Sequence, residues 1–358
     1  MRHRFAATAC CLLVVLSGCA GVGVGPGTPT DGTPMSPTAT ETAPPPDGTL
    51  EVHAIDVGQA DATLLRTGEE TMLIDSGDWR DDGETVLEYL DAHDVDRIDH
   101  LVSTHSHADH IGGHEAIIDH YETERGGIGA VYDSGVTHTS QTYERYLDAV
   151  ERHNVTLFEV RSGDEIPLDG AAATVLSPSP PVGDDLHSNG VSVSIAVGET
   201  SFLFTGDAER ETESRLLETH GDRLDVDVYQ AGHHGSNTSS GPAFLDTVDP
   251  AVAIVSSGYD SQFGHPHDEP LERFADRGIR TVWTGIHGSI VLESDGEEIV
   301  IRTQTAATTS PLEIKTAPEA TAAPADPTEE RFVVGAAAAA TAIGVEALAP
   351  VTAAGVIA

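Results

Sequence analysis

The chain has 358 residues, which is enough for one large domain or two ordinary ones with a sizeable core. Its 59 acidic residues face only 18 basic ones, for a formal net charge of -41, and this balance argues against a basic groove that grips nucleic acid at low salt. The acidic residues are spread along the whole chain rather than clustered, as on a halophile's surface, and at molar salt, with a Debye length of about 3 Å, their repulsion would largely vanish.

The first nineteen residues have the pattern of a lipoprotein signal peptide. Arg2 and Arg4 precede an apolar run over residues 5–16 that is too short to span a bilayer comfortably. Residues 16–19 resemble a lipoprotein box, in which cleavage before Cys19 leaves that thiol to carry lipid. An ordinary secretory signal is the alternative. All three cysteines lie in this segment, so the folded part has no thiolate ligand and no disulfide.

Two segments are too poor in large apolar residues to form a core. Residues 20–49 are rich in Gly, Pro, Thr and Ser and are expected to be a flexible linker. Residues 303–358 are rich in Ala, Pro and Thr, and we expect a low-complexity, loosely structured tail there. The sequence thus predicts one folded domain over residues 50–302, held outside the membrane on a tether.

Within residues 50–302, short strands alternate with helices. Strands are expected at 50–57, 62–66, 71–74, 98–103, 130–132, 156–160, 191–197, 201–204, 226–229, 252–255, 281–283 and 289–292. Helices are expected over 85–93, 115–121, 141–153 and 269–276. Several strands form hairpins, and this arrangement predicts a sandwich of sheets covered by helices rather than a parallel doubly wound fold.

The densest group of possible metal ligands follows the apolar run at 98–103. His105 and His107 alternate in an extended segment, so both side chains can project from one side of a strand end. Asp109 and His110 follow as the chain turns towards a helix. Imidazole and carboxylate suit Zn²⁺, Mn²⁺ or Fe, and four such groups exceed what one ion needs from a single loop. The alternative is a polar surface loop in a protein with 18 histidines.

Three later segments offer partners for this loop. Asp207 closes the strand at 201–204, and a carboxylate there can bridge two cations, although an Asp in a turn is common. His233 and His234 follow the strand at 226–229 and must point in different directions, so we expect one to ligate and the other to contact substrate or support a ligand. His265 precedes the helix at 269–276, where a loop without chemistry is the alternative.

Together these residues resemble the metallo-β-lactamase superfamily, whose HxHxDH motif matches His105, His107, Asp109 and His110. Within it the chain is similar to the hydrolase domain of the ComEC family of DNA-uptake competence proteins. Residues 55–62 are similar to the DVGQGDA motif of that family, with Ala60 in place of its second glycine. Four further motifs fit the same order, at 73–77, 204–207, 233–236 and 264–267. The resemblance covers roughly residues 50–302, the hydrolase domain but not the membrane channel of that family.

The resemblance implies an αββα sandwich and a hydrolase of phosphodiester bonds that uses two divalent ions, Zn²⁺ or Mn²⁺. It implies that His105 and His107 hold the first ion, that Asp109 and His110 hold the second, and that Asp207 bridges the two. His233 would complete the second site. The residues expected to act on the substrate are Asp109, His234 and His265, with either histidine protonating the leaving oxygen or clamping phosphate.

The chain departs from the family pattern at two places. His187 lies near the position of a further first-site histidine in many superfamily members, but the competence family is Asn-rich there, closer to residues 189–192, so ligation by His187 stays open. The family usually has a lysine around residues 233–236, where this chain has Gln230 and Asn237. Whether a cation contacts phosphate there therefore stays open as well.

The leading hypothesis is therefore a lipid-anchored nuclease on the extracellular face of the cell membrane, acting on DNA for uptake or nutrition. Two alternatives remain: a small-molecule phosphodiesterase or lactonase of the same fold, and a non-catalytic surface module that binds DNA. Four further polar residues are expected to shape the loops under the site rather than to react: Asp56, Gln59, Asp61 and Asp75.

Overall fold

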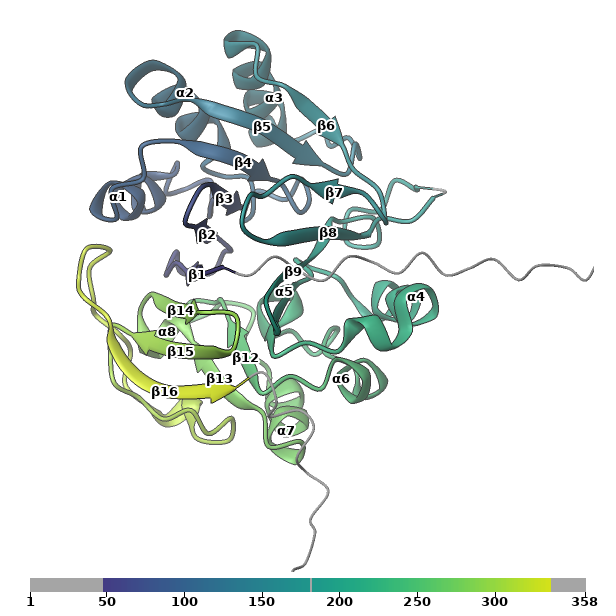
Figure 1. Ribbon diagram of the computed structural model, residues 1–358, viewed down its shortest axis with the longest axis vertical. Coiled ribbons are helices and arrows are strands. Elements are labelled where there is room, and N and C mark those ends of the chain that lie inside the picture. Colours follow the sequence, from purple (N-terminus) through teal and green to yellow (C-terminus); the bar gives the residue numbers. More distant parts are fainter. Residues whose placement is uncertain (1–47, 181, 336–358) are drawn as a thin grey trace, which may run out of the picture. The chain divides into compact units, whose positions relative to one another are not determined.

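The computed structural model describes residues 48–180 and 182–335 of the chain. The expected signal peptide with Cys19, nearly all of the linker and the end of the tail lie outside these residues. Within the described ranges, sixteen strands form two sheets (Figure 1). No helix in this described part is long and apolar enough to cross a membrane.

The first sheet has nine strands among the described residues. Its four last strands in spatial order pair in parallel, and all other pairs are antiparallel. In spatial order the strands are β16 (Glu329–Gly335), β15 (Glu298–Thr303), β14 (Ile290–Ser294), β1 (Leu50–Ala54), β2 (Thr63–Thr67), β3 (Thr71–Ile74), β4 (Ile98–Val102), β5 (Ile128–Asp133) and β6 (Leu157–Glu159).

The second sheet has seven strands in the described part of the chain. In spatial order they are β13 (Arg280–Trp283), β12 (Val252–Val255), β11 (Val228–Gln230), β10 (Thr200–Phe204), β9 (Ser192–Val197), β8 (Ala172–Ser177) and β7 (Glu165–Ile166). The strands from β10 to β13 are parallel to one another. Both sheets are therefore mixed, as expected from hairpins interleaved with helices.

Helices cover the outer face of each sheet. The described helices are α1 (Glu84–Ala92), α2 (His114–Glu124), α3 (Gln141–His153), α4 (Arg210–His220), α5 (Gly232–Gly235), α6 (Pro242–Val248), α7 (Asp268–Asp276) and α8 (Thr284–His287), with 3-10 turns η1 (Gly221–Leu224) and η2 (Ile314–Thr316). Local signals set their ends: the Ser140 side chain accepts from the Tyr143 backbone N–H at the start of α3, and Pro242 opens α6.

Alternation of side chains along the strands produces three apolar layers. In β10, Phe202 and Phe204 point between the two sheets, whereas Leu203 points outward to the layer under α4 and α6. In β2, Leu65 points between the sheets and Leu64 points to the layer under α1, α2 and α3. The order helix, sheet, sheet, helix confirms the predicted αββα sandwich.

The parallel strands bring the polar motifs to one edge of the sandwich. The loop that contains His105 follows β4, and Asp75 follows its parallel neighbour β3. In the second sheet, Asp207 follows β10 and the pair His233 and His234 follows β11. Because the carboxyl ends of parallel neighbours lie at the same edge, segments far apart in sequence meet there.

The tail differs from the expectation over residues 303–335. β16 pairs with β15 along its length, Phe332 and Val334 pack against the central core, and Ile314 is fully buried. Composition does not predict this strand, because it has few apolar side chains. Its stability depends on pairing with the edge of β15. The sequence interpretation also left out β7, β8, β15, α4 and α6, whose residues form regular structure.

Candidate metal centre

The loop after β4 is held in place by the end of β3. The Asp75 carboxylate accepts hydrogen bonds from the Thr104 backbone N–H (2.8 Å) and hydroxyl (2.6 Å). The backbone N–H of Ser76 donates to the His110 carbonyl at 2.7 Å. Gly112 lies against the chain at Asp78 and Trp79 so closely that a Cβ would lie 2.2 Å from the Trp79 nitrogen. Only glycine fits there, which explains the glycine pair that ends the motif.

A first group of ligand atoms gathers around His107. Its Nδ1 lies 2.8 Å from Nε2 of His105 and 3.2 Å from Nε2 of His187. Oδ2 of Asp207 lies 3.7 Å from His105 Nε2 and 3.9 Å from His187 Nε2. Tetrahedral ligands of Zn²⁺ are separated by about 3.3 Å, so this group has the spacing of a metal site. His187, whose ligation stays a prediction, lies with His105 and His107.

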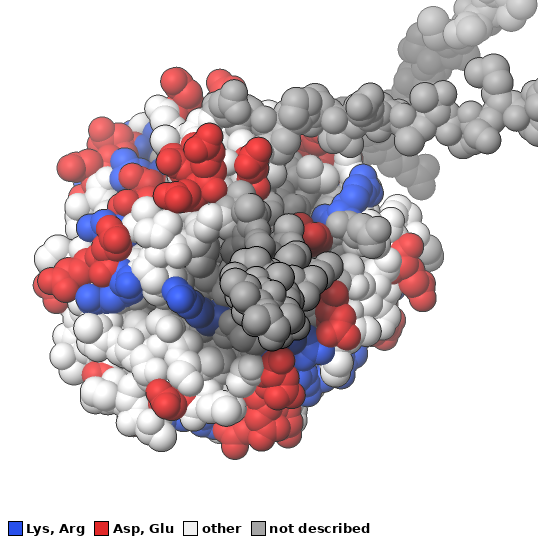
Figure 2. Space-filling view, turned by 60° about the horizontal axis from the view of Figure 1, so that its bottom comes forward, with Lys and Arg blue, Asp and Glu red and all other residues white. Residues whose placement is uncertain are grey.

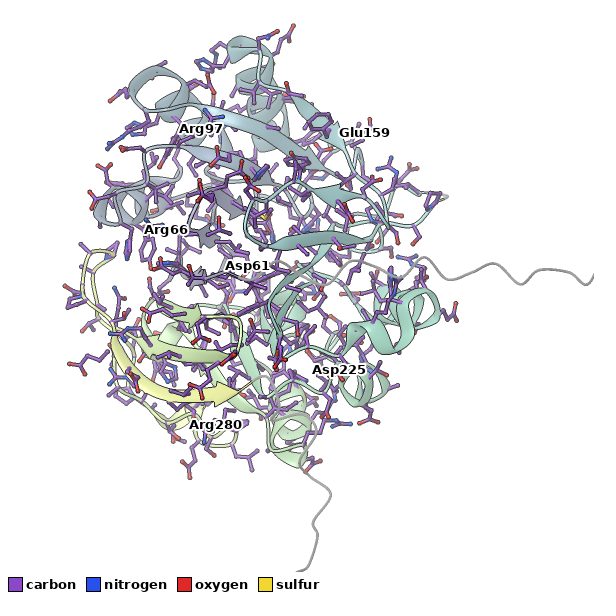
Figure 3. The ribbon with its side chains drawn as sticks, viewed as in Figure 1. Asp61, Arg66, Arg97, Glu159, Asp225 and Arg280 are labelled. Atoms are coloured by element: carbon purple, nitrogen blue, oxygen red, sulfur yellow. The ribbon has the colours of Figure 1, made fainter. Side chains whose placement is uncertain are left out.

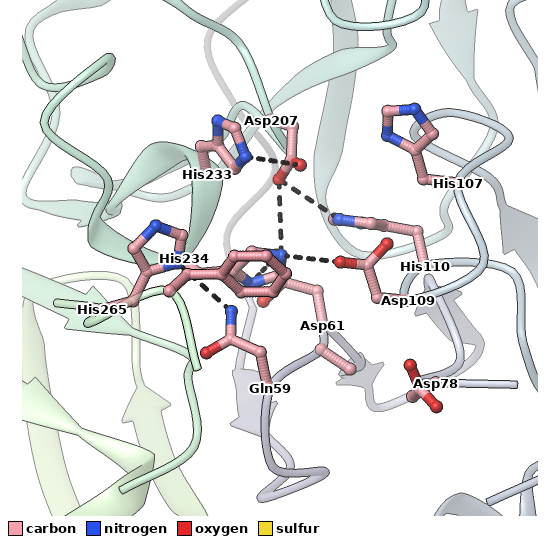
Figure 4. Close-up of polar contacts among 12 residues, drawn as sticks. Gln59, Asp61, Asp78, His107, Asp109, His110, Asp207, His233, His234 and His265 are labelled. Atoms are coloured by element: carbon pink, nitrogen blue, oxygen red, sulfur yellow. Dashed lines mark hydrogen bonds and ion pairs between the residues drawn. The ribbon is translucent and has the colours of Figure 1, made fainter. Parts of the chain in front are cut away.

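A second group shares Asp207 with the first. Oδ1 of Asp207 lies 3.2 Å from Nε2 of His110 and 3.7 Å from Nε2 of His234, and Asp61 joins the same group (Figure 4). Asp109 stands beside it, with Oδ2 3.5 Å from Nε2 of His234. Because its two oxygens face the two groups, Asp207 lies where the sequence interpretation expected a bridging carboxylate.

Three buried atoms of the second group fit a cation. His110 Nε2, His234 Nε2 and Asp207 Oδ1 have no hydrogen-bond partner among the described residues. The opposite nitrogens are occupied, because His110 Nδ1 donates to Asp75 (2.7 Å) and His234 Nδ1 donates to the Ser256 carbonyl (3.0 Å). With Nδ1 engaged, Nε2 is the nitrogen that each ring has left for a metal ion, and leaving such atoms buried and unpaired would be costly. The residues present fit a divalent metal ion.

His234, rather than His233, lies in the second group of ligand atoms. His234 is 2 % exposed and joins the second group, whereas His233 lies towards the first, with Nε2 3.5 Å from Asp207 Oδ2. On its other side, Nδ1 of His233 lies 3.2 Å from Oε1 of Glu209, which also faces Nδ1 of His187 at 3.7 Å. Two adjacent histidines can diverge this way because both adopt left-handed backbone angles, φ 53° and 57°.

His265 lies at the rim of the centre, outside the metal-binding groups. Its ring is 5.8 Å from that of His233 and 6.1 Å from that of His234, centroid to centroid. The Gln59 amide donates to His265 Nδ1 at 3.2 Å, so Nε2 carries the hydrogen and is a donor. Its contact with the substrate stays a prediction.

Burial and opposite charge divide the histidines into two kinds. Burial lowers the pKa of His105 well below its usual value and that of His107 to about 4, so both are neutral at pH 7. Burial also acts on His234, but Asp207 and Asp61 outweigh it and raise the pKa of His234 to about 9. A metal ion that binds through His234 therefore displaces a proton.

Two residues of the centre were assigned no ligand or catalytic role in the sequence interpretation. Asp61 was expected only to shape loops, yet it is buried near the middle of the molecule, in the second group, and accepts from Gln230 at 2.9 Å (Figure 3). Its place in the motif at 55–62 was the available signal. Glu209 follows Asp207 by two residues, and only the fold reveals that it faces two histidines. Asp75, by contrast, orients His110 and shapes the loop as predicted.

Comparison with known proteins identifies the family. The family described as "Metallo-beta-lactamase superfamily" matches residues 55–259, more than half of the chain. The chain belongs to the metallo-beta-lactamase superfamily. This membership and the cluster of His and Asp side chains indicate a metal-dependent hydrolase.

Relatives within the superfamily include competence proteins, as the motifs predicted. The chain is 30% identical to ComE operon protein 3 of Bacillus subtilis (strain 168), over 67% of the chain and 32% of that protein. It is 29% identical to competence protein ComA of Neisseria gonorrhoeae, over 68% of the chain and 32% of that protein. The chain thus spans about a third of the length of these relatives.

Solved structures with a similar arrangement are more distant in sequence. The metallo-beta-lactamase fold protein YhfI from Bacillus subtilis has a TM-score of 0.47 and 12% identity, over 69% of this chain and 100% of that one. A diphosphatase from the PhnP family has a TM-score of 0.42 and 17% identity, over 69% of this chain and 97% of that one.

Proposed function

We propose that this protein is a phosphodiesterase that cuts DNA with two divalent ions, Zn²⁺ or Mn²⁺. The single observation that supports this most is the position of Asp207, whose two oxygens face two separate groups of ligand atoms. DNA as the substrate rests on the similarity to competence proteins. The acidic surface does not oppose it, because in molar salt the repulsion between surface carboxylates and DNA is screened.

One ion would be held by His105, His107 and His187 with Asp207, and the other by His110, His234 and Asp109 with Asp207. When bound, the two ions would supply positive charge for the phosphate oxygens and lower the pKa of an attacking water. Asp61 lies against His234 Nδ1 at 3.7 Å and with Ser256 keeps that ring oriented. Asp75 does the same for His110.

Two rim histidines would act on the substrate. His265 is held by Gln59 with its Nε2 hydrogen free, so it would donate to a phosphate oxygen. The His233 side chain is 22% exposed and is backed by the Glu209 carboxylate at 3.2 Å. Burial lowers the pKa of His233, so with Nδ1–H directed at Glu209 its Nε2 is an acceptor, and His233 would take up a proton from the attacking water.

The proposal places the enzyme on the outer face of the cell membrane, tethered by lipid on Cys19, where it would meet DNA for uptake or nutrition. Its support is the pattern of the first nineteen residues. Replacement of Cys19 by Ser should move the protein from the membrane fraction to the medium, and unchanged fractionation would contradict the anchor.

The experiment that tests the reaction measures cleavage of end-labelled DNA in molar KCl with Mn²⁺ or Zn²⁺. The wild type should cut, and Asp207→Ala and His107→Ala should each lose at least about a hundredfold in rate. The partly exposed His120 on α2 offers a matched control, because it belongs to none of the groups of ligand atoms. Equal rates for wild type and Asp207→Ala would contradict the proposal. Hydrolysis of a small diester by an enzyme that does not cleave DNA would point to a small-molecule substrate.

A further inference from the structure

Two exposed aromatic side chains flank a groove beside the second group of ligands. Trp79 is 47% exposed and Phe263 is 56% exposed. Only five large hydrophobic side chains are exposed in the part of the chain that the structure describes, and these two line the same groove of about 450 Å³. The groove is also lined by Asp109, which lies beside His234 of the second group, and by Gln59, which contacts His265.

Both aromatic residues are carried by backbone that is fixed to the centre. The Trp79 backbone N–H donates to the Ala108 carbonyl at 2.9 Å, next to Asp109. The ring of Phe263 lies 5.7 Å from that of His265, and His267 Nε2 donates to the Phe263 carbonyl at 3.1 Å. Each ring is thus held beside a residue that the proposed reaction uses, and neither contributes to the apolar cores.

The charges of the groove are unsuited to gripping a phosphate backbone. Among the described residues that line it, Asp78, Asp81 and Asp109 are acidic and Arg80 is the one cation. Arg80 is already engaged, with Nη1 3.0 Å from Asp78 Oδ2 and its Cζ 4.9 Å from the centre of the Trp79 ring. A ligand that binds here must therefore gain its affinity from flat, neutral, apolar faces rather than from its phosphates.

We propose that Trp79 and Phe263 stack on nucleobases next to the scissile phosphate, so that the enzyme selects single-stranded DNA or frayed ends over intact duplex. This inference rests on the proposed function and names its substrate class. Bases expose their faces only where they are unpaired, and aromatic stacking on single strands tolerates any sequence. Stacking also survives molar salt, which screens contacts between cations and phosphates.

Tryptophan fluorescence gives a direct binding measurement. The chain has two tryptophans, and Trp283 is 2 % exposed, so a ligand that quenches emission reports on Trp79. Chelator-treated protein in 2 M KCl is titrated with an oligodeoxythymidylate and with a blunt DNA hairpin of equal length. We expect the single strand to quench the emission and to bind at least about tenfold more tightly than the hairpin.

Variants then separate stacking from the chemistry. Phe263→Ala should weaken oligonucleotide binding about fivefold or more, and Trp79→Ala should lower the cleavage rate of single strands to a similar extent, while hydrolysis of bis(4-nitrophenyl) phosphate stays unchanged in both. The matched control is Phe158→Ala, which removes an equally exposed ring (48%) from the distant strand β6.

The inference is overturned if the hairpin binds as tightly as the single strand, or if Phe263→Ala behaves like Phe158→Ala. These results can be told apart from a failure of the proposed function. Oligonucleotide binding that depends on Phe263 without any DNA cleavage would refute the nuclease and support the stacking groove. DNA cleavage without preference for single strands would support the nuclease and refute the stacking groove.

Discussion

At the scale of single residues, the centre depends on hydrogen bonds that fix one nitrogen of each imidazole. His110 and His234 each donate Nδ1–H to an oxygen at 2.7–3.0 Å and direct Nε2 to Asp207. The adjacent His233 has its Nδ1 towards Glu209 and lies outside the second group. Two neighbouring histidines therefore have different chemistry because of what holds their far nitrogens.

This difference predicts different losses in two variants. His234→Ala should bind one fewer metal ion per chain after dialysis, because a ligand of the second group is removed. His233→Ala should keep the metal content of the wild type and lose roughly a hundredfold in turnover, since a proton acceptor is removed. Metal analysis beside rate measurement separates the two. The assignment fails if His233→Ala is the variant that loses the ion.

A buried carboxyl on α4 predicts a pH dependence of stability. Glu213 is 3 % exposed, and burial raises its pKa to about 7, although the Gly241 N–H and Arg210 oppose the shift. Its pKa in the unfolded chain is about 4.3. Because the folded-state value is the higher one, the stability linked to the Glu213 proton is fully present below pH 4.3 and is lost as pH rises through 7.

The difference in free energy of unfolding between Glu213→Gln and the wild type should therefore shift in favour of the variant by about 1–3 kcal/mol as pH rises from 5 to 8. Denaturant titrations at both pH values, at constant high salt, measure it. Glu211→Gln on the same helix is the control, because the Glu211 side chain is 76% exposed. An equal difference in free energy of unfolding between Glu213→Gln and the wild type at pH 5 and at pH 8 would contradict this prediction.

At the scale of elements, the parallel strands β3 and β4 and the parallel strands β10 to β12 assemble the centre by ending at one edge. The sequence predicted these strands because each is a short apolar run followed at once by a polar motif. Whether His187 would lie with His105 and His107 stayed open in the sequence, since His187 sits in an irregular segment between β8 and β9 whose course follows no periodicity.

Tail strand β16 could not be predicted for a related reason. Its partners are the backbone groups of β15, and an edge strand gains its stability from that pairing rather than from its own composition. Phe332 is the one aromatic side chain it offers, and the guanidinium of Arg280 lies 4.5 Å from the ring centre. The strand is thus tied to both sheets.

Phe332→Ala should lower the free energy of unfolding by about 2 kcal/mol, because the ring packs against the central core and under Arg280. Val333→Ala is the matched control on the same strand. Its side chain is 41% exposed, and the expected loss is less than about 0.5 kcal/mol. Guanidinium chloride unfolding of the three proteins measures both. Equal stability of the two variants would show that β16 is not part of the cooperative fold.

At the scale of the whole molecule, acidic side chains dominate the surface. Figure 2 shows Asp and Glu scattered over the visible face with basic side chains among them. In Figure 3, Glu159 lies on the edge strand β6 of the first sheet and Arg97 directly precedes β4. Many arginines are paired, as Arg97 is with Asp99 at 2.6 Å. With a formal charge of -41, repulsion among the remaining carboxylates opposes the compact state.

The free energy of unfolding should therefore rise as KCl increases from 0.1 to 2 M, because added ions screen that repulsion. Thermal unfolding followed by circular dichroism at several KCl concentrations measures it. The steepest gain should come at the low end, where the Debye length shrinks from about 10 Å towards 3 Å. Stability that is flat or falling over this range would contradict a halophilic surface.

The central claim is that two metal ions held through Asp207 hydrolyse DNA. Titration of Mn²⁺ into chelator-treated protein, with cleavage of a single-stranded oligonucleotide followed at each step, tests it most directly. The account predicts no cleavage without metal and a rate that reaches its plateau at two equivalents per chain, with Asp207→Ala inactive throughout. Full cleavage by chelator-treated protein, or a plateau that Asp207→Ala also reaches, would contradict it.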